Sequence, residues 1–543
     1  MGGELKRLCV LALLIAPLSM AQMLPMVGGQ TSSSGGGSTV ATPTVDTPAG
    51  TYPYGTQIGV FESTPGATTC VTYDGTTPTA PTPGTCGNGT PFAGHGLVVS
   101  QTVQAIGTKS GLTNSSVFSA AYVVTASIPS MIVPAGTYTS GMITGLNLSA
   151  SGTNCFSIDG STPTATTPGT CDGTTYSTPF SLSGNTTVKA IGTAVGLVNT
   201  AVQSFVYTIS GASCTPASGY SHCRALTIDH TQVGGSTLSA FPVLVAATLG
   251  SSKIQNASCF DVVFSADLLG VNPIPWEQET CVQSTGVLVD WVRPYFVSAS
   301  ADTTIYVSYG NSGISTAQNS GGSAWKALVW VNLSGVGVYS AVYHLPDGTS
   351  LTTLDSTVSG RNGTNSGLTA TAGQIDGGAA TTGGSNEIAL PSNALTFTNN
   401  FTVSGWANLT TQSSYQAIWS DAGTNRFLGS NPSGQAYAHT SAGGALVNGP
   451  TITAGWHYFV MTKSSSTGLI LYYDGAATTN SGGTGASTSN SASDIGAAAG
   501  SFPWVGSLDE IRLVGVVMSA GWVTAEYNNQ KASSTFLTVG SEI

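Results

Sequence analysis

Apolar and polar residues alternate over short runs along much of the chain. The segments "LVDWVRPYF" (288–296) and "TTIYVSYG" (303–310) are examples, and this two-residue period is typical of a β-strand with one buried face. Turn residues separate such runs, and Gly accounts for 70 of the 543 residues. The pattern predicts an all-β chain of short strands joined by many turns.

Composition narrows the class of protein further. Hydrophobic residues make up 41% of the chain, which is enough to build packed cores, whereas charged residues make up only 7%. The formal net charge is −11 with 13 Lys and Arg, so the chain lacks the clustered cations that bind nucleic acid or anionic lipid. We therefore expect no nucleic-acid partner.

The first residues predict export from the cell. The sequence "MGGELKRLCVLALLIAPLSMAQ" combines two cations, an apolar run and small residues at positions 19 and 21. This is the form of a signal peptide cleaved after residue 21, and the apolar run is too short to span a bilayer. We expect a signal peptide over 1–21, a Gly/Ser linker over 22–42, and a secreted protein with no transmembrane segment.

Two long stretches of the chain repeat after about 85 residues. The copies are "PAGTYPYGTQIGV" (48–60) with "PAGTYTSGMITGL" (134–146), and "VQAIGTKSGLTNSSV" (103–117) with "VKAIGTAVGLVNTAV" (188–202). A repeat of this length with strand-like runs predicts two small β-sandwich domains, over 43–126 and 129–209.

Cysteine usage predicts disulfides rather than a metal site. Nine cysteines include Cys9 of the predicted signal peptide, which leaves an even number in an oxidising compartment. The first two neighbouring pairs have the same spacing inside repeated sequence, and no CxxC motif is present. We expect neighbours to pair, as Cys70–Cys86, Cys155–Cys171, Cys214–Cys223 and Cys259–Cys281.

The cysteines enclose a duplicated polar loop, "YDGTTPTAPTPGTCGNG" (73–89) and "IDGSTPTATTPGTCDG" (158–173). An acidic residue before glycine could contribute to a calcium loop, but such a loop needs several alternating oxygen ligands. Asp74 and Asp159 stand almost alone among Thr, Ser and Pro. We interpret both loops as structural turns closed by disulfides.

The two repeats resemble the immunoglobulin-like module at the C-terminus of bacterial chitobiases. The resemblance rests on "STPGATTCVTYDGTTPT" and on "VKAIGT" followed by "GLVNTAV". It implies Ig-like spacer domains without catalytic activity.

The next segment, 215–312, resembles a bacterial β domain of uncharacterised function that often precedes lectin-like domains. The points of similarity are Phe241-Pro242-Val243, Asp261, Glu277, Trp291-Val292 and Tyr309-Gly310-Asn311. The resemblance implies a β-sandwich with no assigned activity.

A linker at 313–334 leads into the last domain, 335–543. Its segments "FTVSGW", "GWHYFV", "LYYDG" and "LDEIRL" resemble those of laminin-G-like, concanavalin A-like jelly rolls. That family implies binding of carbohydrate or protein ligands, often with calcium. Pro346 in "VYHLPDGTS" departs from the polar or acidic residue common there, which puts a ligand role for this turn in doubt.

No catalytic motif emerges from the sequence. Jelly-roll glycosidases carry a Glu-x-Asp-x-x-Glu strand, and the chain has none, nor a G-x-S-x-G or HExxH motif. Glu277 and Glu279 of "PIPWEQETC" share a strand face beside Trp276 and could act as acid and base. Because two neighbours on one strand face suit glycosidase geometry poorly, we interpret them as part of a solvated edge strand. We predict that the protein is not an enzyme.

One acidic residue is a candidate calcium ligand. In "LDEIRLV", Asp509 has the strand parity of Ile511 and Leu513, so we expect it on an apolar face, where a carboxylate needs a partner. The laminin-G resemblance allows Ca²⁺ there, with Asp355 and backbone carbonyls as further ligands. The alternative is that loop amides satisfy Asp509.

Aromatic residues provide the second binding signal, because sugars stack on Trp and Tyr rings. Trp406 and Trp456 lie in alternating strands and are expected in the core. Trp504, in the loop-like "AGSFPWVG", is the candidate for an exposed ligand-binding ring, and Tyr437 in "GQAYAHT" is the second.

Together these features predict a secreted, non-catalytic protein that binds a polysaccharide or surface glycan through its terminal jelly roll. Two alternatives stay open. One is a structural or adhesive surface protein whose jelly roll binds protein, and the other is a polysaccharide hydrolase. An exposed aromatic cleft would favour sugar binding, and a flat apolar patch would favour a protein partner.

Overall fold

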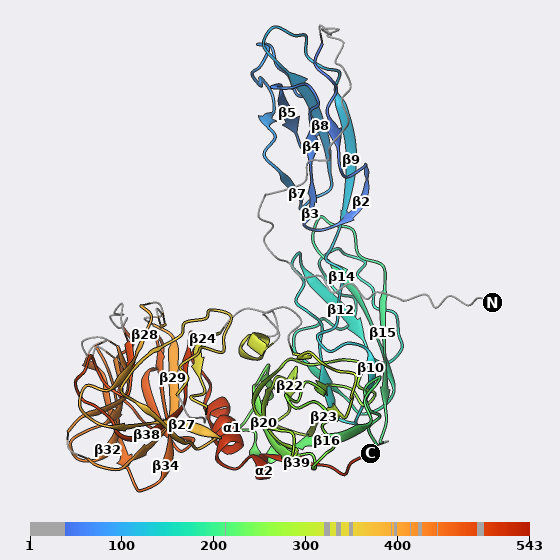
Figure 1. Ribbon diagram of the computed structural model, residues 1–543. Coiled ribbons are helices and arrows are strands. Elements are labelled where there is room, and N and C mark those ends of the chain that lie inside the picture. Colours follow the sequence, from blue (N-terminus) through green and yellow to red (C-terminus); the bar gives the residue numbers. More distant parts are fainter. Residues whose placement is uncertain are drawn as a thin grey trace. The chain divides into compact units, whose positions relative to one another are not determined.

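The computed structural model describes residues 39–543 apart from 212, 320–325, 333–337, 347–350, 393, 396–398, 413, 422–425, 442–443 and 486–492 (Figure 1). The predicted signal peptide lies outside the described residues, as does most of the predicted 22–42 linker. Within the described part nearly all of the regular secondary structure is strand, which confirms the all-β fold class. None of its helices is long and apolar enough to cross a membrane.

Contacts divide the chain into two compact units near Tyr122. The first unit contains most of the first predicted repeat. The strands of this repeat form a five-stranded sheet and two small two-stranded sheets. The sheets are β2(Gly50–Pro53)-β9(Phe118–Thr125)-β8(Gln101–Thr108)-β5(Thr68–Thr72)-β6(Thr90–Pro91), β3(Thr56–Ile58)-β7(His95–Leu97) and β1(Thr44–Val45)-β4(Val60–Phe61).

The second repeat folds in the same way. Its sheets are β10(Gly136–Tyr138)-β15(Gln203–Ile209)-β14(Thr186–Thr193)-β12(Thr153–Ser157) and β11(Met142–Thr144)-β13(Phe180–Leu182). This order matches β2-β9-β8-β5 of the first repeat. The corresponding strands "QTVQAIGT" and "TTVKAIGT" have the same sequence of buried and half-buried positions. The sequence repeat is therefore also a repeat of topology and of core positions.

All four predicted disulfides are present, as Cys70–Cys86, Cys155–Cys171, Cys214–Cys223 and Cys259–Cys281. In the duplicated loops the Asp carboxylates fix local turns. Asp74 Oδ1 accepts hydrogen bonds from the backbone N–H and hydroxyl of Thr76, and Asp159 Oδ1 does the same with Ser161. These contacts match the structural interpretation of the loops.

The middle domain follows the second repeat and is built from three sheets. They are β19(Val262–Ser265)-β23(Thr303–Tyr309)-β16(His222–Ile228)-β39(Leu537–Val539), β18(Val243–Thr248)-β21(Val287–Val292)-β20(Trp276–Val282) and β17(Leu238–Ser239)-β22(Phe296–Val297). The short helix η1 (His230–Gln232) follows β16. An apolar core formed from these strands fills the domain.

The last strand of this domain comes from the far end of the sequence. β39 pairs antiparallel with β16, so that Leu226 lies opposite Val539 and Ile228 opposite Leu537. The predicted jelly-roll range extends to residue 543, but the structure places this final segment in the sheet of the middle domain.

The jelly roll has two sheets with one core between them. The first, here called the inner sheet, is β26(Thr369–Ala372)-β27(Gly377–Thr382)-β38(Val505–Val514)-β29(Phe401–Leu409)-β34(Trp456–Ser464)-β35(Gly468–Tyr473)-β36(Ala476–Asn480), with β24(Tyr339–Tyr343) also paired to β38. The second, here called the outer sheet, is β25(Thr364–Ser366)-β28(Glu387–Leu390)-β37(Ser493–Ile495)-β30(Gln416–Asp421)-β31(Arg426–Ser430)-β32(Gln435–Thr440)-β33(Leu446–Thr451).

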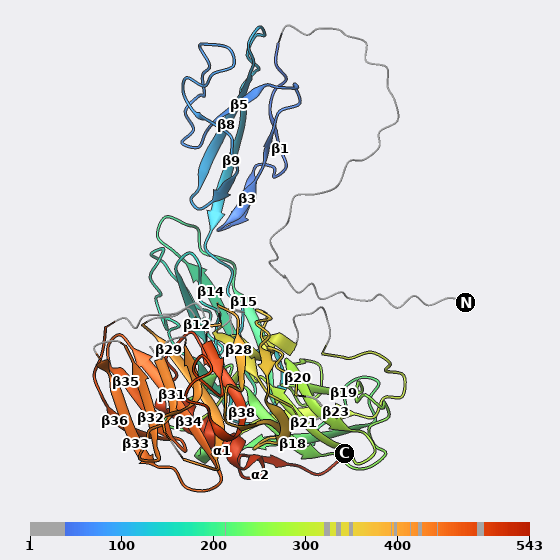
Figure 2. The same cartoon turned by 60° about the vertical axis from the view of Figure 1, so that its left-hand side comes forward.

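The inner sheet is covered on both faces. One face contributes to the core of the jelly roll, and the other packs Trp406, Tyr458 and Val514 into a second cluster with Leu244 and Trp291 of the middle domain. Helix α1 (Ala520–Lys531) contacts β18 of the middle domain and β36 of the jelly roll, and Figures 1 and 2 show it between the two. The 3-10 helix η2 (Lys326–Trp330) adds Trp330 to the same cluster.

A β-bulge in β38 overturns the predicted orientation of Asp509. Leu508, Ile511 and Leu513 all belong to the core of the jelly roll, which an unbroken two-residue period does not allow. Glu510 has φ 52° and marks the extra residue, and the pairing with β29 shifts there. Asp509 lies opposite Trp406, on the face that meets the middle domain.

Candidate functional site

The outer sheet of the jelly roll carries a surface pocket of about 200 Å³ lined almost entirely by aromatic rings. The lining residues are Tyr415, Phe427, Tyr437, His439 and Phe502. We call this group the aromatic pocket. None of its described lining residues is an Asp, Glu, Lys or Arg.

The alternation of β32 places two of these rings. Tyr437 and His439 lie on one face of the strand, while Ala436 and Ala438 on the other face enter the core. Gly429 of β31 lies opposite Tyr437. A Cβ atom at Gly429 would approach the Gln416 carbonyl oxygen to 1.9 Å, so this close backbone approach requires glycine.

The rings pack against one another and leave their edges open to solvent. The centroid of Tyr437 is 5.2 Å from that of Tyr415 and 5.8 Å from that of Phe427. Phe427 is 3% exposed and forms the floor, whereas Tyr415 and Phe502 are each 37% exposed. Burial by these neighbours raises the pKa of the Tyr437 phenol above its ordinary value.

This chemistry suits a ligand with apolar faces and neutral hydroxyl groups. Aromatic rings present flat apolar surfaces, and two phenols and an imidazole add hydrogen-bonding groups at the edge. Pyranose and furanose rings combine C–H faces with hydroxyls in this way. The described lining residues of the pocket offer no fixed charge that would select an anionic or cationic ligand.

The two predicted ligand-binding aromatics have different environments. Tyr437 lies in the aromatic pocket, but Trp504 is 0% exposed within the core of the jelly roll. Its Nε1–H donates to the Asn408 carbonyl at 3.3 Å. The prediction that Trp504 is exposed was therefore wrong, because the chain enters β38 directly after it and turns the indole inward.

The exposed ring of that loop is Phe502, two residues earlier. It lies within the same "AGSFPWVG" segment, so the segment carries a binding signal even though the ring assigned to it was the wrong one. Tyr415 and Phe427 had no sequence signal of their own. They join Tyr437 only through pairing of β30, β31 and β32, which a single sequence does not reveal.

The structure does not bring the two predicted calcium ligands together. Among the described residues, neither Asp355 nor Asp509 belongs to a cluster of three groups able to hold a metal ion. The Asp355 carboxylate accepts hydrogen bonds from the backbone N–H groups of Val342, Thr357 and Arg361, and so fixes its loop. Asp509 Oδ2 accepts from the Ile375 N–H at 2.9 Å, and burial raises the pKa of Asp509 well above its ordinary range.

The predicted solvated position of Glu277 and Glu279 is wrong. β20 is an edge strand of its sheet, as expected, but the jelly roll covers it. The side chains of Glu277 and Glu279 are 7% and 1% exposed. A bulge between Gln278 and Thr280 accompanies this arrangement, and both carboxylates lie near His344.

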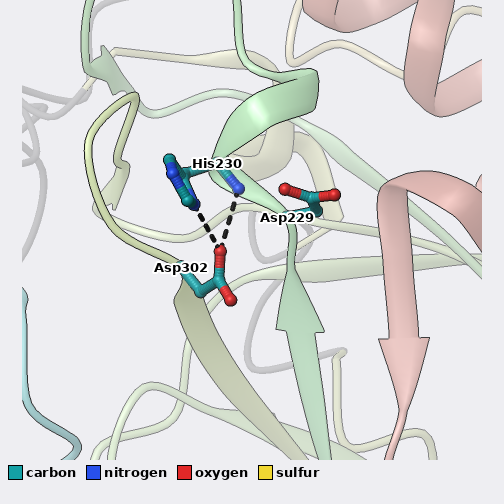
Figure 3. A group of neighbouring side chains, drawn as sticks. All are labelled: Asp229, His230 and Asp302. Atoms are coloured by element: carbon teal, nitrogen blue, oxygen red, sulfur yellow. Dashed lines mark hydrogen bonds and ion pairs between the residues drawn. The ribbon is translucent and has the colours of Figure 1, made fainter.

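A second acidic cluster lies on the surface of the middle domain (Figure 3). Asp302 Oδ1 accepts from the backbone N–H of His230 and is 2.7 Å from His230 Nδ1. This hydrogen bond lowers the pKa of Asp302. Asp229 instead caps η1 by accepting from Thr231, so the cluster is accounted for as local turn structure.

Comparison with protein families gives two partial matches. Residues 382–524 match the family described as the concanavalin A-like lectin/glucanases superfamily, and this range includes the whole aromatic pocket. Residues 151–207, within the second repeat, match the family described as Fn3 associated. No curated protein matches the chain.

Several solved structures are similar to part of the chain. Domain 4 of the extracellular arabinanase AbnA of Geobacillus stearothermophilus, in complex with arabinotriose, is 19% identical (TM-score 0.29; 34% of this chain, 96% of that one). The sialidase CBM40 of Ruminococcus gnavus, bound to α2,3-sialyllactose, is 12% identical (TM-score 0.22; 24% and 84%). The binding domain of Paraclostridial Mosquitocidal Protein 1 is 13% identical (TM-score 0.28; 35% and 51%).

Proposed function

We propose that this protein is an extracellular, non-catalytic carbohydrate-binding protein whose jelly roll binds a neutral polysaccharide or glycan at the aromatic pocket. The observation that carries the proposal is the cluster of partly exposed rings around Tyr437. The cluster lies in the range that matches a lectin and glucanase superfamily.

The location of the acidic residues supports a binding role without catalysis. Glycoside hydrolysis uses two carboxyl groups that flank the scissile bond. The described lining of the aromatic pocket contains none. Asp509 and Glu510 are each 0% exposed beneath the middle domain, where a polysaccharide has no access to them.

The rest of the chain supports an extracellular setting. Four disulfides persist in oxidising compartments and are rare in the cytosol. In this proposal the two repeats act as spacers, because their described loops are closed by disulfides and local turns.

Glycan binding by the full chain tests the proposal. The probes are xylan, laminarin and arabinan as neutral polysaccharides, with a sialylated lactose conjugate as an anionic probe. We expect retention on at least one neutral polysaccharide. Because stacking on Tyr437 would be lost, Tyr437→Ala should weaken that binding about tenfold.

Phe61→Ala is the matched control, since Phe61 is an aromatic residue that is 55% exposed but lies in the first repeat. Its removal should leave binding unchanged. Equal losses in Phe61→Ala and Tyr437→Ala would place the glycan elsewhere. Release of reducing sugar would contradict the non-catalytic proposal, and silence on every glycan would favour the adhesive, protein-binding alternative.

The same binding experiment also tests whether ligand binding requires calcium. Each probe is tested with CaCl₂ and with a chelator. Binding lost with chelator and restored by Ca²⁺ would support a calcium ligand set. Asp509→Asn would then show whether Asp509 belongs to that set.

A further inference from the structure

A buried group of ionisable side chains lies where the middle domain meets the jelly roll. Glu279 comes from β20, His344 follows β24, and Glu510 is the bulged residue of β38. Their side chains are 1%, 6% and 0% exposed. Three separate segments, from two domains, therefore place ionisable groups at one buried location.

The geometry of the three groups fits a shared cation. One ligand atom from each residue lies within 4.8 Å of the others. His344 Nδ1 is 2.6 Å from Glu510 Oε1 and 3.7 Å from Glu279 Oε2. Zinc binds imidazole nitrogen and carboxylate oxygen at about 2.0–2.2 Å, so an ion between these atoms would need only small movements of the side chains.

Both carboxylates have hydrogen-bond donors, and His344 has a carboxylate near its second ring nitrogen. Glu277 Oε2 lies 3.4 Å from His344 Nε2 and accepts a hydrogen bond from Trp330 Nε1, while Nε2 has no hydrogen-bond partner among the described residues. Trp291 Nε1–H donates to Glu279 Oε2 at 2.8 Å, and Arg512 donates to Glu510 Oε2 at 2.7 Å. Metal-binding histidines commonly donate their other N–H to a carboxylate, and metal-binding carboxylates are themselves hydrogen-bonded.

An independent observation also points to a missing partner. Glu279 Oε1 is buried and has no hydrogen-bond partner among the described residues. A buried carboxylate oxygen without a partner is unfavourable. Its companion Oε2 already faces His344, so a cation there could be bound by both oxygens of Glu279.

Several further ionisable side chains surround the group. Five buried carboxyl groups gather here, beside the guanidinium of Arg512 and the imidazole of His344. They belong to Glu277, Glu279, Asp509, Glu510 and Glu526. Burial raises the pKa of Glu279 and Asp509, so these two add no standing negative charge at neutral pH, and a cation bound to Glu279 would displace its proton.

We propose that Glu279, His344 and Glu510 bind one divalent transition-metal ion of the zinc class. The imidazole nitrogen and the small number of oxygen ligands favour zinc over calcium, which takes six to eight oxygens. Because the ligands come from two domains, the ion joins the middle domain to the jelly roll. This site is independent of the aromatic pocket and of glycan binding.

The test uses the full chain, stripped with chelator, dialysed and then titrated with ZnCl₂. We expect one zinc per chain by elemental analysis. With free zinc about a hundredfold above its Kd, the melting temperature should rise by about 5 °C. Co²⁺ in place of zinc should give visible absorption bands from nitrogen and oxygen ligands.

Two variants locate the ion. Glu279→Gln keeps the shape of the side chain and an oxygen that can accept from Trp291, so it should fold while losing the zinc-induced rise in melting temperature. His344→Gln should lose both this rise and the Co²⁺ spectrum. His230→Gln is the matched control, because His230 belongs to the acidic surface cluster of Figure 3 and its removal should change neither signal.

Each possible outcome decides the proposal. A wild-type chain that takes up no zinc and does not change in stability overturns it. So does a zinc response that survives in Glu279→Gln, or one that disappears only in His230→Gln. If His344→Gln fails to fold, Glu279→Gln alone still separates the two results. A stronger response to CaCl₂ than to ZnCl₂ overturns the metal class.

Discussion

The two sheets of the jelly roll use their non-core faces differently. On the outer sheet, Tyr437 belongs to a ring cluster partly open to solvent. On the inner sheet, the corresponding face is closed by the middle domain, and Arg512 lies 4.3 Å above the ring of Trp291. The same two-layer fold therefore presents one face to a ligand and the other to a neighbouring domain.

This difference explains why composition differs between the two faces. A face that meets solvent can hold partly exposed aromatic rings with no ionic partners. A face closed by another domain needs every charge matched, because an unpaired buried charge is strongly unfavourable. Arg512 accordingly pairs with both Glu510 and Glu526.

The largest expected effect on stability comes from removing the ion pairs on the inner-sheet face that the middle domain covers. Arg512→Met should lower the free energy of unfolding by about 3–5 kcal/mol, because Glu526 would remain buried without its cation and Glu510 would keep only His344. Denaturant unfolding followed by tryptophan fluorescence measures this change. Lys531→Met, at an exposed cation 5.1 Å from the Tyr527 ring, should cost less than about 1 kcal/mol. Similar losses of unfolding free energy in both variants would contradict the proposed difference between the covered and the open face.

The next effect tests whether the middle domain and the covered sheet unfold together. Leu537 of β39 is 3% exposed in the core of the middle domain, so Leu537→Ala should cost about 2–3 kcal/mol. We expect one cooperative transition for middle domain and jelly roll, measured by fluorescence and by circular dichroism. Thr538→Ala, at the exposed neighbour, should cost less than about 0.5 kcal/mol. Two separated transitions in the wild type would show that the jelly roll and the middle domain unfold independently, and that their contact contributes little to stability.

On the open face, stability and binding should separate. Tyr437→Ala should lower the free energy of unfolding by only about 1 kcal/mol, because the ring is half-buried at the surface. Its effect on glycan affinity is expected to be about tenfold. Parallel unfolding and binding measurements check this, and a stability loss as large as that of Arg512→Met would remove the distinction between the faces.

The smallest expected effect concerns pH. Burial raises the pKa of Tyr437 above the ordinary value of about 10, so its phenol should stay protonated and glycan affinity unchanged from about pH 7 to about pH 9. Affinity measured across this range tests the expectation. A loss of affinity that appears in the wild type but not in Tyr437→Phe would show that the phenol ionises in this interval.

Local patterns predicted the features that depend on nearby residues. The all-β class follows from alternation and turn content, and the disulfides follow from cysteine order. The two repeats share strand order because they share sequence. Tyr437 was also predicted, as the second candidate for an exposed aromatic ring, and it lines the aromatic pocket.

Features that depend on bulges or on distant segments were not predictable. Counting parity through β38 gives the wrong face for Asp509, because the bulge at Glu510 adds one residue. Trp504 and Phe502 share one loop, and nothing local decides which ring turns inward. Glu277 and Glu279 were predicted to be solvated, because the residues that cover them belong to the jelly roll, which lies later in the sequence.

Strand β39 means that the jelly roll is an insertion within the middle domain. The polypeptide leaves that domain after β23, forms the jelly roll, and returns to pair with β16. A protease cut between Tyr309 and Tyr339 would therefore nick the backbone without freeing either fragment. The two pieces should migrate as one particle on a sizing column and separate only in denaturant.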